Sequence, residues 1–256
     1  MIKLSAIVLT KDEELTDTLE SLSFCEEIII IKDENSKFQA SNYKQIQSTN
    51  VKVFKHNLAD DFAGQRNYGL SKAKNEWVLF VDADERVSGA LASEVSGILY
   101  LVYPRPELES KAGISGYYIK RRDYIWGKEI KHGEAGNMKL IRLAKRNAGL
   151  WRRSVHEYWD IKGEVGELKN PLIHHPHQTL REFIEHLNYF SSLHAEENKK
   201  EGKASNIFKI ILWPKLKFFY NYFIRLGFLD GTAGFVLVVM MSFHSFLAWS
   251  KQWLDG

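Results

Sequence analysis

The fold is decided by the stretch Trp77-Val78-Leu79-Phe80-Val81-Asp82-Ala83-Asp84-Glu85, an apolar run that ends abruptly in acidic residues. Such a run predicts a strand buried on both faces. A similar run opens the chain at 5–10, and four consecutive isoleucines follow at 28–31. Segments with helical spacing lie between these runs, and alternation of this kind predicts an α/β fold with a mostly parallel sheet. The predicted strands are 5–10, 28–31, 51–54 and 77–81, and the predicted helices are 12–22, 38–47, 62–74 and 88–101.

Polar clusters follow three of these strands. They are Thr10–Glu14, Lys32–Ser36 and Asp82–Glu85. Ligands of parallel α/β sheets bind outside the carboxyl ends of the strands, so we expect the three clusters to line one edge. From Gly113 the pattern changes to shorter, more mixed strands, predicted at 114–120, 138–143 and 155–159.

Composition narrows the class of protein. The 256 residues are 45% hydrophobic and 26% charged, which is typical of a globular chain long enough to bury a core. The net charge of +3 is too small to indicate a nucleic-acid partner. A single cysteine, Cys25, excludes an internal disulfide and a cysteine-based zinc site. The opening residues lack the long apolar stretch of a secretory signal, so we expect a cytoplasmic domain.

Asp82 and Asp84 stand at the mouth of the predicted fourth strand. Two neighbouring carboxylates repel each other unless a cation or ligand compensates them. Oxygen ligands suit Mg²⁺ or Mn²⁺, which usually also hold substrate phosphates. The alternative is a strand-end turn whose acids are solvated.

Two other motifs have competing interpretations. Gln65-Arg66-Asn67 lies near the start of a helix that Asp61 could cap. There it would hold a diphosphate or the turn beside it, or it is part of an ordinary exposed helix. His174-His175-Pro176-His177 resembles a zinc site only superficially, because the spacing is undefined and proline prevents a regular helix. We therefore expect His174 to lie beside a substrate or to anchor a loop.

The C-terminal part has a different composition. Leu180–Lys200 predicts an amphipathic helix that ends near Gly202. Residues 203–229 hold five bases and no acid among many aromatic residues, with Pro214 expected to break the helix, and this composition is typical of a membrane-surface segment. Residues 231–250 carry no charge and are long enough to span a bilayer, but polar residues such as His244 favour interfacial or re-entrant helices over a span or core packing. The predicted domains are 1–180 and a membrane-associating tail, 181–256.

Several motifs together resemble a known family. Ser5–Glu14 is similar to the opening of family 2 glycosyltransferases, and Gln65-Arg66-Asn67 followed by the strand that ends at Glu85 resembles their central block. The later motifs resemble the subgroup of bacterial lipopolysaccharide-core β-glucosyltransferases: Arg142, Val155-His156-Glu157, Pro171–His174 and Arg225–Gly231. This resemblance implies a GT-A fold, a nucleotide-sugar donor and inversion at the anomeric carbon.

The resemblance also implies residue roles. Asp84 would ligate Mg²⁺ or Mn²⁺, and Asp82 would lie near the ribose and the metal. The remaining residues implied to bind the nucleotide sugar are Thr10, Asp12, Glu13, Asp33, Arg66 and Asn67. Transfer further needs a base to take the proton of the acceptor hydroxyl. We predict Glu157 as this base and Glu134 as its reserve, with His156 as either a third metal ligand or a structural histidine.

The predicted function is an inverting, metal-dependent transfer of a hexose, glucose by the resemblance, from a UDP-hexose to a lipid-linked saccharide such as the lipopolysaccharide core. The enzyme would be peripheral, on an anionic membrane surface at the cytoplasmic face of the bacterial inner membrane. Alternative acceptors are a capsule, O-antigen or protein precursor. Two other classes stay open. One is a sugar-phosphate nucleotidyltransferase, which would carry a glycine-rich basic loop where this chain has Lys11-Asp12-Glu13-Glu14. The other is a non-catalytic membrane-binding module.

Overall fold

The computed structural model describes residues 2–34, 50–102, 113–154, 157–176 and 178–255. These residues form two compact units. The sheet unit comprises Met1–Arg121 and Lys139–His174, and the helical unit comprises Arg122–Met138 and His175–Gly256. The helix predicted at 38–47 lies outside the described residues.

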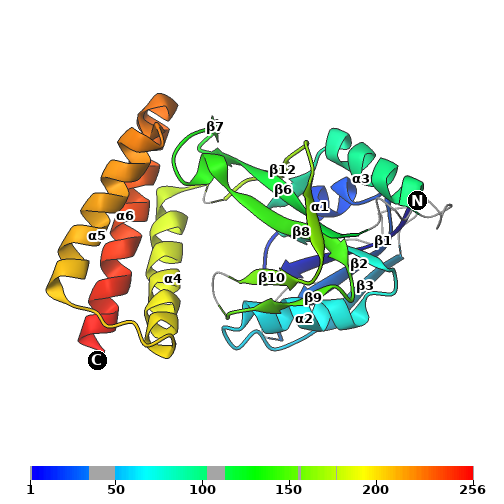
Figure 1. The fold of residues 1–256 in the computed structure, drawn as a ribbon, viewed down its shortest axis with the longest axis horizontal. Coiled ribbons are helices and arrows are strands. Elements are labelled where there is room, and N and C mark those ends of the chain that lie inside the picture. Colours follow the sequence, from blue (N-terminus) through cyan, green and yellow to red (C-terminus); the bar gives the residue numbers. More distant parts are fainter. Residues whose placement is uncertain (1, 35–49, 103–112, 155–156, 177, 256) are drawn as a thin grey trace. The chain divides into compact units, whose positions relative to one another are not determined.

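A parallel half-sheet occupies the first part of the sheet unit (Figure 1). Its strands are β1 (Ile2–Thr10), β2 (Cys25–Lys32), β3 (Asn50–Lys55) and β4 (Trp77–Asp82). They pair in parallel in the order β3-β2-β1-β4, which confirms the four predicted strands. β1 lies between β2 and β4, and its residues Ala6, Ile7 and Val8 are fully buried.

The second half of the sheet is mostly antiparallel. β8 (Lys139–Lys145) pairs antiparallel with both β4 and β6 (Ile114–Ile125), and the order continues through β12 (Leu172–His174) to β5 (Glu85–Val87). β11 (Glu164–Glu167) runs parallel to β6. A separate hairpin joins β9 (Gly149–Arg152) to β10 (Tyr158–Ile161). The strand predicted at 155–159 therefore begins only at Tyr158 within the described residues.

Helices cover both faces of the parallel half-sheet. Successive side chains of a strand point to opposite faces, so the mostly apolar strands present apolar surface on both sides. Ala6 and Val8 belong to one apolar cluster, with residues of α1 (Thr16–Ser21) and α3 (Gly89–Val102). Ile7 belongs to the other, with residues of α2 (Phe62–Lys72). The predicted cap of α2 is confirmed, because Asp61 Oδ1 accepts a hydrogen bond from the Gly64 amide at 2.9 Å.

The first predicted helix, 12–22, is wrong at its start, because α1 begins at Thr16. The carboxylate of Glu13 explains the difference. It accepts hydrogen bonds from the backbone amides of Lys11 and Asp12, at 2.7 and 3.1 Å. This bonding holds the preceding residues as a loop, a common use of short acidic motifs in competition with helix formation.

The helical unit contains three main helices, α4 (Leu180–Lys200), α5 (Ile207–Phe219) and α6 (Gly231–Leu254). α6 contacts both α4 and α5. A π-helical turn (Tyr220–Ile224) and a 3₁₀ turn (Gly227–Asp230) connect α5 to α6, and β7 (Lys128–Ile130) pairs with the end of β6. The predicted break at Pro214 is wrong, because α5 continues through it. Among the described residues, Gly227–Leu254 is the one segment long and apolar enough to cross a membrane.

Candidate active site

The carboxyl edge of the parallel strands brings the first predicted residues together. Thr10 ends β1, and its Oγ1 atom donates to Glu13 Oε2 at 2.7 Å. The backbone amide of Asp33, just beyond β2, donates to the Thr10 carbonyl at 3.3 Å, and Asp33 Oδ2 accepts from the Leu58 amide at 3.0 Å. The predicted convergence after β1 and β2 is therefore confirmed for Asp33, whereas residues 35–36 of the second cluster lie outside the described residues.

Asp82 lies at the end of β4 between two buried arginines. Its Oδ1 atom accepts from Arg66 Nη2 of α2 at 2.9 Å and from Arg142 Nη1 of β8 at 3.4 Å. Its Oδ2 atom accepts from Arg142 Nη2. Burial alone would raise the pKa of Asp82, but the charges of Arg142 and Arg66 outweigh it and hold the pKa below its ordinary value.

Glu85 completes this group from the start of β5. It is fully buried, and its carboxylate accepts hydrogen bonds from the Asp82 amide at 2.9 Å and from Arg142 Nη2 at 3.3 Å. Burial raises the pKa of Glu85 by more than Arg142 lowers it. A buried carboxyl with these partners fixes the turn that carries Asp82, Ala83 and Asp84.

Arg66 also reaches Glu157, which precedes β10. Its Nε and Nη2 atoms lie 3.0 and 2.9 Å from Glu157 Oε1. The guanidinium group stacks over the Trp151 ring, 4.6 Å from its centroid. Asn67 holds the same tryptophan through its backbone, donating to the Trp151 carbonyl at 3.0 Å and accepting from the amide at 2.9 Å. The arginine and the asparagine of the central motif thus tie α2 to β4 and to the β9–β10 hairpin.

Asp84 faces a histidine. Its side chain is 43% exposed, and its Oδ2 atom lies 3.2 Å from Nε2 of His174, a buried residue at the end of β12. Burial raises the pKa of Asp84, but the hydrogen bond and charge of His174 outweigh it and lower the pKa. His174 belongs to the strand that pairs with β5, so this contact joins two segments 90 residues apart.

Comparisons with known proteins show which family the first part of the chain matches. The family model described as glycosyl transferase family 2 matches residues 5–94, which contain β1 to β5 and the Asp82–Glu85 turn. The chain carries a family 2 glycosyltransferase domain. It is 27% identical over 257 residues to the lipopolysaccharide core biosynthesis glycosyltransferase LpsC of Rhizobium meliloti (strain 1021), covering 98% of this chain and 92% of that protein. The family and the enzyme class expected from the sequence are confirmed.

Further comparisons agree with this assignment. The chain is 25% identical over 266 residues to the uncharacterized glycosyltransferase RT0209 of Rickettsia typhi (strain ATCC VR-144 / Wilmington), covering 98% of this chain and 87% of that protein. Among solved structures, the mannosyltransferase PcManGT from Pyrobaculum calidifontis has a TM-score of 0.55 at 12% identity, covering 99% of this chain and 88% of that one. This likeness in fold confirms the predicted α/β, GT-A class.

The glycosyltransferase has a partial donor set for a divalent cation. No cluster of three or more histidine, cysteine, aspartate or glutamate residues that could hold a metal occurs among its described residues. The oxygens of Asp82 are taken by two arginines, whereas Asp84 is half exposed. Mg²⁺ is usually bound by only one or two carboxylates together with substrate phosphates and water. Asp84 therefore fits such an ion when a diphosphate supplies further ligands.

Two further predictions concern His156 and Glu134. His156 lies outside the described residues. Glu134 belongs to the helical unit, where its Oε2 atom lies 3.0 Å from Lys217 Nζ of α5.

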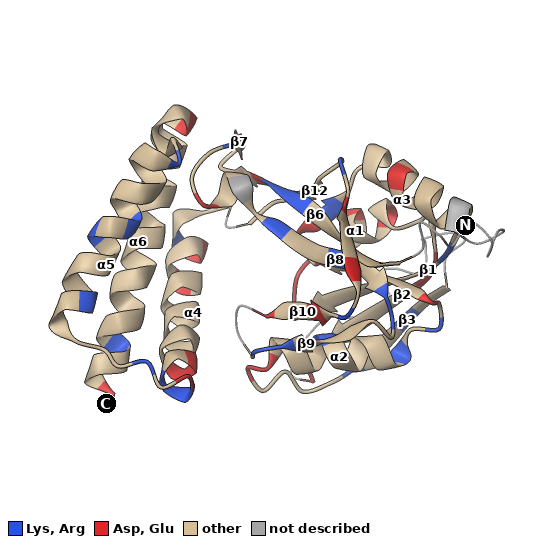
Figure 2. Ribbon diagram, in the orientation of Figure 1, with Lys and Arg blue, Asp and Glu red and all other residues tan. Residues whose placement is uncertain are grey.

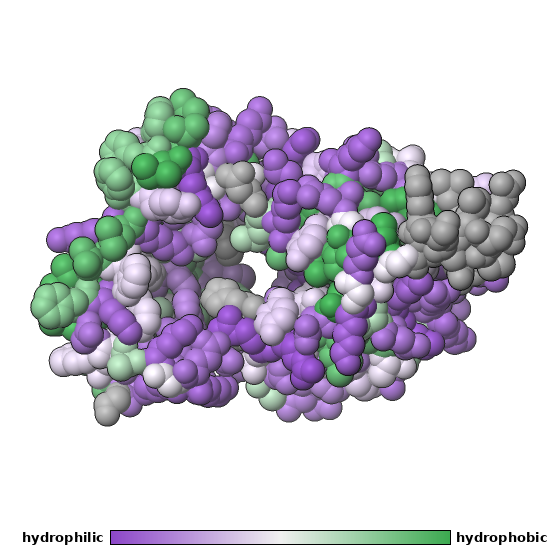
Figure 3. Space-filling model, in the orientation of Figure 1, coloured by the Kyte–Doolittle hydropathy of each residue, from purple (hydrophilic) through white to green (hydrophobic). Residues whose placement is uncertain are grey.

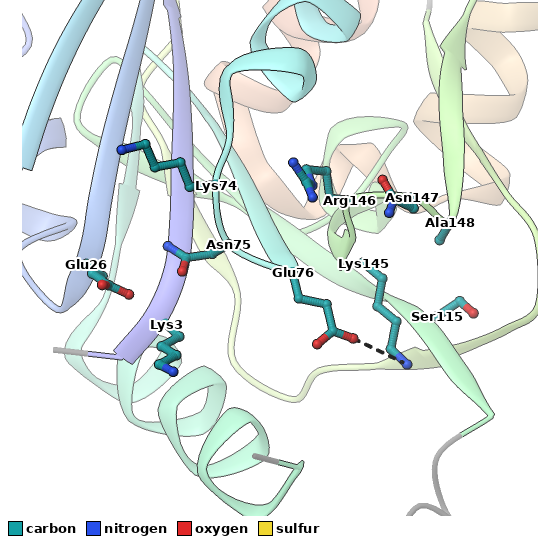
Figure 4. Close-up of a pocket in the computed structure, with 10 residues that line it drawn as sticks. All are labelled: Lys3, Glu26, Lys74, Asn75, Glu76, Ser115, Lys145, Arg146, Asn147 and Ala148. Atoms are coloured by element: carbon teal, nitrogen blue, oxygen red, sulfur yellow. Dashed lines mark ion pairs between the residues drawn. The ribbon is translucent and has the colours of Figure 1, made fainter. Parts of the chain in front are cut away.

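A pocket of the enzyme lies at the opposite edge of the sheet (Figure 4). It has a volume of about 650 Å³, and its lining includes Lys3 near the start of β1 and Lys74, just before β4. One ion pair crosses it, between Lys145 and Glu76 at 3.8 Å. Because the catalytic edge of such sheets is at the carboxyl ends of the strands, this pocket is not the candidate active site.

Sequence reasoning gave no role to Arg142 or Glu85. Arg142 sits in the mostly apolar strand Lys139–Lys145, and an arginine there is rarely buried without a carboxylate partner. The position of this arginine in the sequence therefore indicates that it pairs with an acidic residue. The identity of the partners, Asp82 and Glu85, depends on strand order, which no local pattern records.

Proposed function

We propose that this glycosyltransferase moves a hexose, glucose by resemblance, from a UDP-hexose to a lipid-linked saccharide at an anionic membrane surface, with inversion at the anomeric carbon. The observation that carries the proposal is that Arg66 pairs with both Asp82 and Glu157 at the carboxyl edge of a family 2 domain, and that Asp84 follows Asp82 in the same turn. The similarity to a lipopolysaccharide core glycosyltransferase supports the saccharide acceptor.

The loops at the carboxyl edge of the parallel strands would bind the nucleotide-sugar donor. Thr10, Asp12 and Glu13 form the loop after β1, and Asp33 lies beside them. We assign these four residues to the base and ribose. The contacts of Arg66 and Asn67 favour a role behind the donor, where they fix the turn and the hairpin that face it.

Asp84 is the residue proposed to hold Mg²⁺ or Mn²⁺. When bound, such an ion neutralises charge that develops on the leaving diphosphate. His174 contacts one oxygen of this carboxylate at 3.2 Å and leaves the other oxygen for the ion. Asp82 stays bound to Arg66 and Arg142, so we assign it to fixing the turn and to contact with the ribose rather than to sole coordination of the ion.

Glu157 is the proposed base. Its carboxylate takes the proton of the acceptor hydroxyl as the oxygen attacks the anomeric carbon, on the face opposite the leaving diphosphate. Its side chain is 18% exposed, so an acceptor can reach it from solvent. Arg66 holds it through two nitrogen atoms and is itself fixed by Trp151 and Asp82. Glu134 is the reserve for this role.

The helical unit supplies the proposed attachment to the membrane. α5 buries only Ile210 and exposes much apolar surface. Figure 2 shows basic and no acidic residues along α5, and Figure 3 shows hydrophobic surface gathered over the same helix. The exposed apolar side chains of α5 are Ile207, Phe208, Ile211, Leu212, Trp213, Leu216 and Phe219.

A peripheral attachment suits α6 better than a span. Lys251 of α6 donates to the Asn188 and Ser191 side chains of α4 at 2.9 Å each, and the ring of His244 lies 5.6 Å from that of His194. Polar groups on α6 thus find partners on α4, a helix with many charged residues that would be costly in hydrocarbon. We therefore place residues 181–256 on the cytoplasmic face of the inner membrane, attached to a transferase domain formed by 1–180.

A thermal-shift screen of nucleotide sugars tests the proposed function. The full chain is screened against UDP-, GDP-, ADP- and dTDP-hexoses, each with Mn²⁺, with Mg²⁺ and with EDTA. We expect UDP-glucose with a metal ion to raise the melting temperature, and EDTA to remove the increase. If no sugar nucleotide changed the melting temperature, a membrane-binding module would be favoured. If only nucleoside triphosphates raised it, a nucleotidyltransferase would be favoured.

A further inference from the structure

An apolar groove runs between α5 and α6 in the helical unit. It is an open groove on the surface, with a volume of about 800 Å³. The π-helical turn closes part of it with Phe223. Its other lining residues are Ile210, Ile211, Pro214, Lys215, Leu216, Phe218, Phe219, Ser242, Phe243 and Phe246.

The groove lies where α5 is irregular. Pro214 has no amide hydrogen for the Ile210 carbonyl, and its ring crowds that carbonyl, which bends a helix. After Phe219, α5 passes into the π-helical turn, a feature often found at functional sites. Pro214 and Phe223 of the π-helical turn both line the groove, so the two irregularities contribute to its wall.

The side chains that line the groove have few groups that could form hydrogen bonds with water. Its one hydroxyl, on Ser242, already donates to the Val238 carbonyl at 2.7 Å. The other side chains are apolar except Lys215, which is exposed at the rim. Water is poorly held where it finds few polar partners. The groove is also continuous with exposed apolar side chains, since Ile211, Phe219 and Phe243 are 48%, 54% and 43% exposed.

The positive charge of residues 203–229 indicates what kind of molecule would bind in the groove. Residues 203–229 contain five bases and no acid. Lys215 lines the groove itself, whereas Lys217, two residues further along the same helix, pairs with Glu134 at 3.0 Å. An occupant that fits both features has a hydrocarbon chain for the groove and an anionic head for the lysine.

We propose that this groove binds one acyl chain of an anionic membrane lipid, with Lys215 meeting its phosphate. This inference rests on the proposed membrane attachment. It goes further because it predicts a defined site that binds one lipid molecule per chain. Bound in this way, the lipid fixes how α5 and α6 rest on the bilayer surface.

The test uses the full chain and decyl phosphate, kept below its micellar concentration, in isothermal titration. We expect saturable binding of one molecule per chain. Phe243→Ala and Phe246→Ala should each weaken it about tenfold, because each removes an aromatic wall. The matched control is Phe208→Ala, which removes a 75% exposed phenylalanine of α5 outside the groove and should leave the affinity within twofold. Lys215→Gln should weaken the binding of decyl phosphate but not the binding of neutral decyl maltoside.

Several results would overturn the proposal. They are absence of saturable binding, binding of many molecules per chain, or an equal loss in Phe208→Ala. Dimerisation of the chain by sedimentation, with no decyl phosphate bound, would show that a second copy covers this face. Melting curves of each variant separate unfolding from loss of binding. Donor binding to UDP-glucose, measured on the same samples, distinguishes failure of this inference from failure of the proposed transferase function.

Discussion

Arg66 joins Glu157 to Asp82, with its Nη2 atom 2.9 Å from Glu157 Oε1 and 2.9 Å from Asp82 Oδ1. The proposed base and the acidic turn at the end of β4 are therefore positioned by a single guanidinium group. Only 5% of the Arg66 side chain is exposed, so water competes little for these bonds.

Replacement of Arg66 should affect both stability and turnover. Arg66→Met leaves two carboxylates without this partner, and breaking a buried ion pair typically costs about 3–5 kcal/mol. Arg66→Lys should recover part of the stability but little turnover, because an ammonium group cannot reproduce the planar fork. Urea unfolding and steady-state kinetics measure the two effects. The control is Arg152→Met, whose side chain is 58% exposed and pairs with Asp160 at 3.5 Å, and which should change stability by less than about 1 kcal/mol. Equal effects of the two substitutions would contradict the positioning role.

Glu157→Gln should reduce the turnover number by about 10²–10⁴-fold, with little change in donor affinity, because the base acts on the acceptor. The amide still accepts a hydrogen bond from Arg66, so the fold should be retained. Single-turnover transfer and titration with UDP-glucose measure the two quantities. If Glu134→Gln gave this pattern and Glu157→Gln did not, the two roles would be exchanged.

The strands were predictable because their signal is local. Runs such as 28–31 are buried wherever they lie in a sheet, and Asp61 caps the helix that directly follows it. The arginine network was not predictable, because it joins residues 66, 82, 142 and 157 from separate elements. The late start of α1 was missed because Glu13 turns back onto its own loop instead of continuing a helix. Pro214 was expected to break the helix, but α5 continues through it from Ile207 to Phe219.

Glu27 should make the stability of the sheet unit depend on pH. Its buried carboxylate accepts from Ser5 Oγ and Lys52 Nζ, both at 2.7 Å. Burial would raise the pKa of Glu27, but the hydrogen bonds, first that of Lys52, lower it. A lowered folded-state pKa stabilises the protein above the ordinary glutamate pKa of about 4.3, and the contribution is lost as pH falls through the folded-state value.

The measurement is urea unfolding between pH 3 and pH 7. Glu27→Gln should cost about 1–3 kcal/mol at neutral pH and should flatten the acidic decline. Glu26→Gln, at the exposed neighbouring position of β2, should keep the wild-type profile. Identical profiles for wild type and Glu27→Gln would show that the Glu27 cluster contributes nothing to the acid sensitivity.

The bases of α5 should govern membrane binding. Lysines near an anionic surface contribute about 1 kcal/mol each, and this attraction weakens with salt. Replacing Lys209, Lys215 and Lys217 by glutamine should therefore abolish the preference for anionic over neutral vesicles, while the apolar contribution persists. Co-sedimentation across a salt series measures it, with Lys199→Gln and Lys200→Gln of α4 as the control. A protein that stays in the supernatant with anionic vesicles at low salt would contradict the peripheral attachment, as would one that resists both salt and alkaline washing.

The central claim is that the carboxyl edge of this family 2 domain activates a sugar nucleotide with a cation held by Asp84. Release of UDP from UDP-glucose tests it most directly, measured with Mn²⁺ and with EDTA on wild type, Asp84→Asn and the control Asp17→Asn, whose side chain is 77% exposed. We predict metal-dependent release by wild type and Asp17→Asn, and a loss of at least about 100-fold in Asp84→Asn, because a charged ligand of the ion is removed. Release that survives in Asp84→Asn at the wild-type rate and with the wild-type metal dependence would contradict the account.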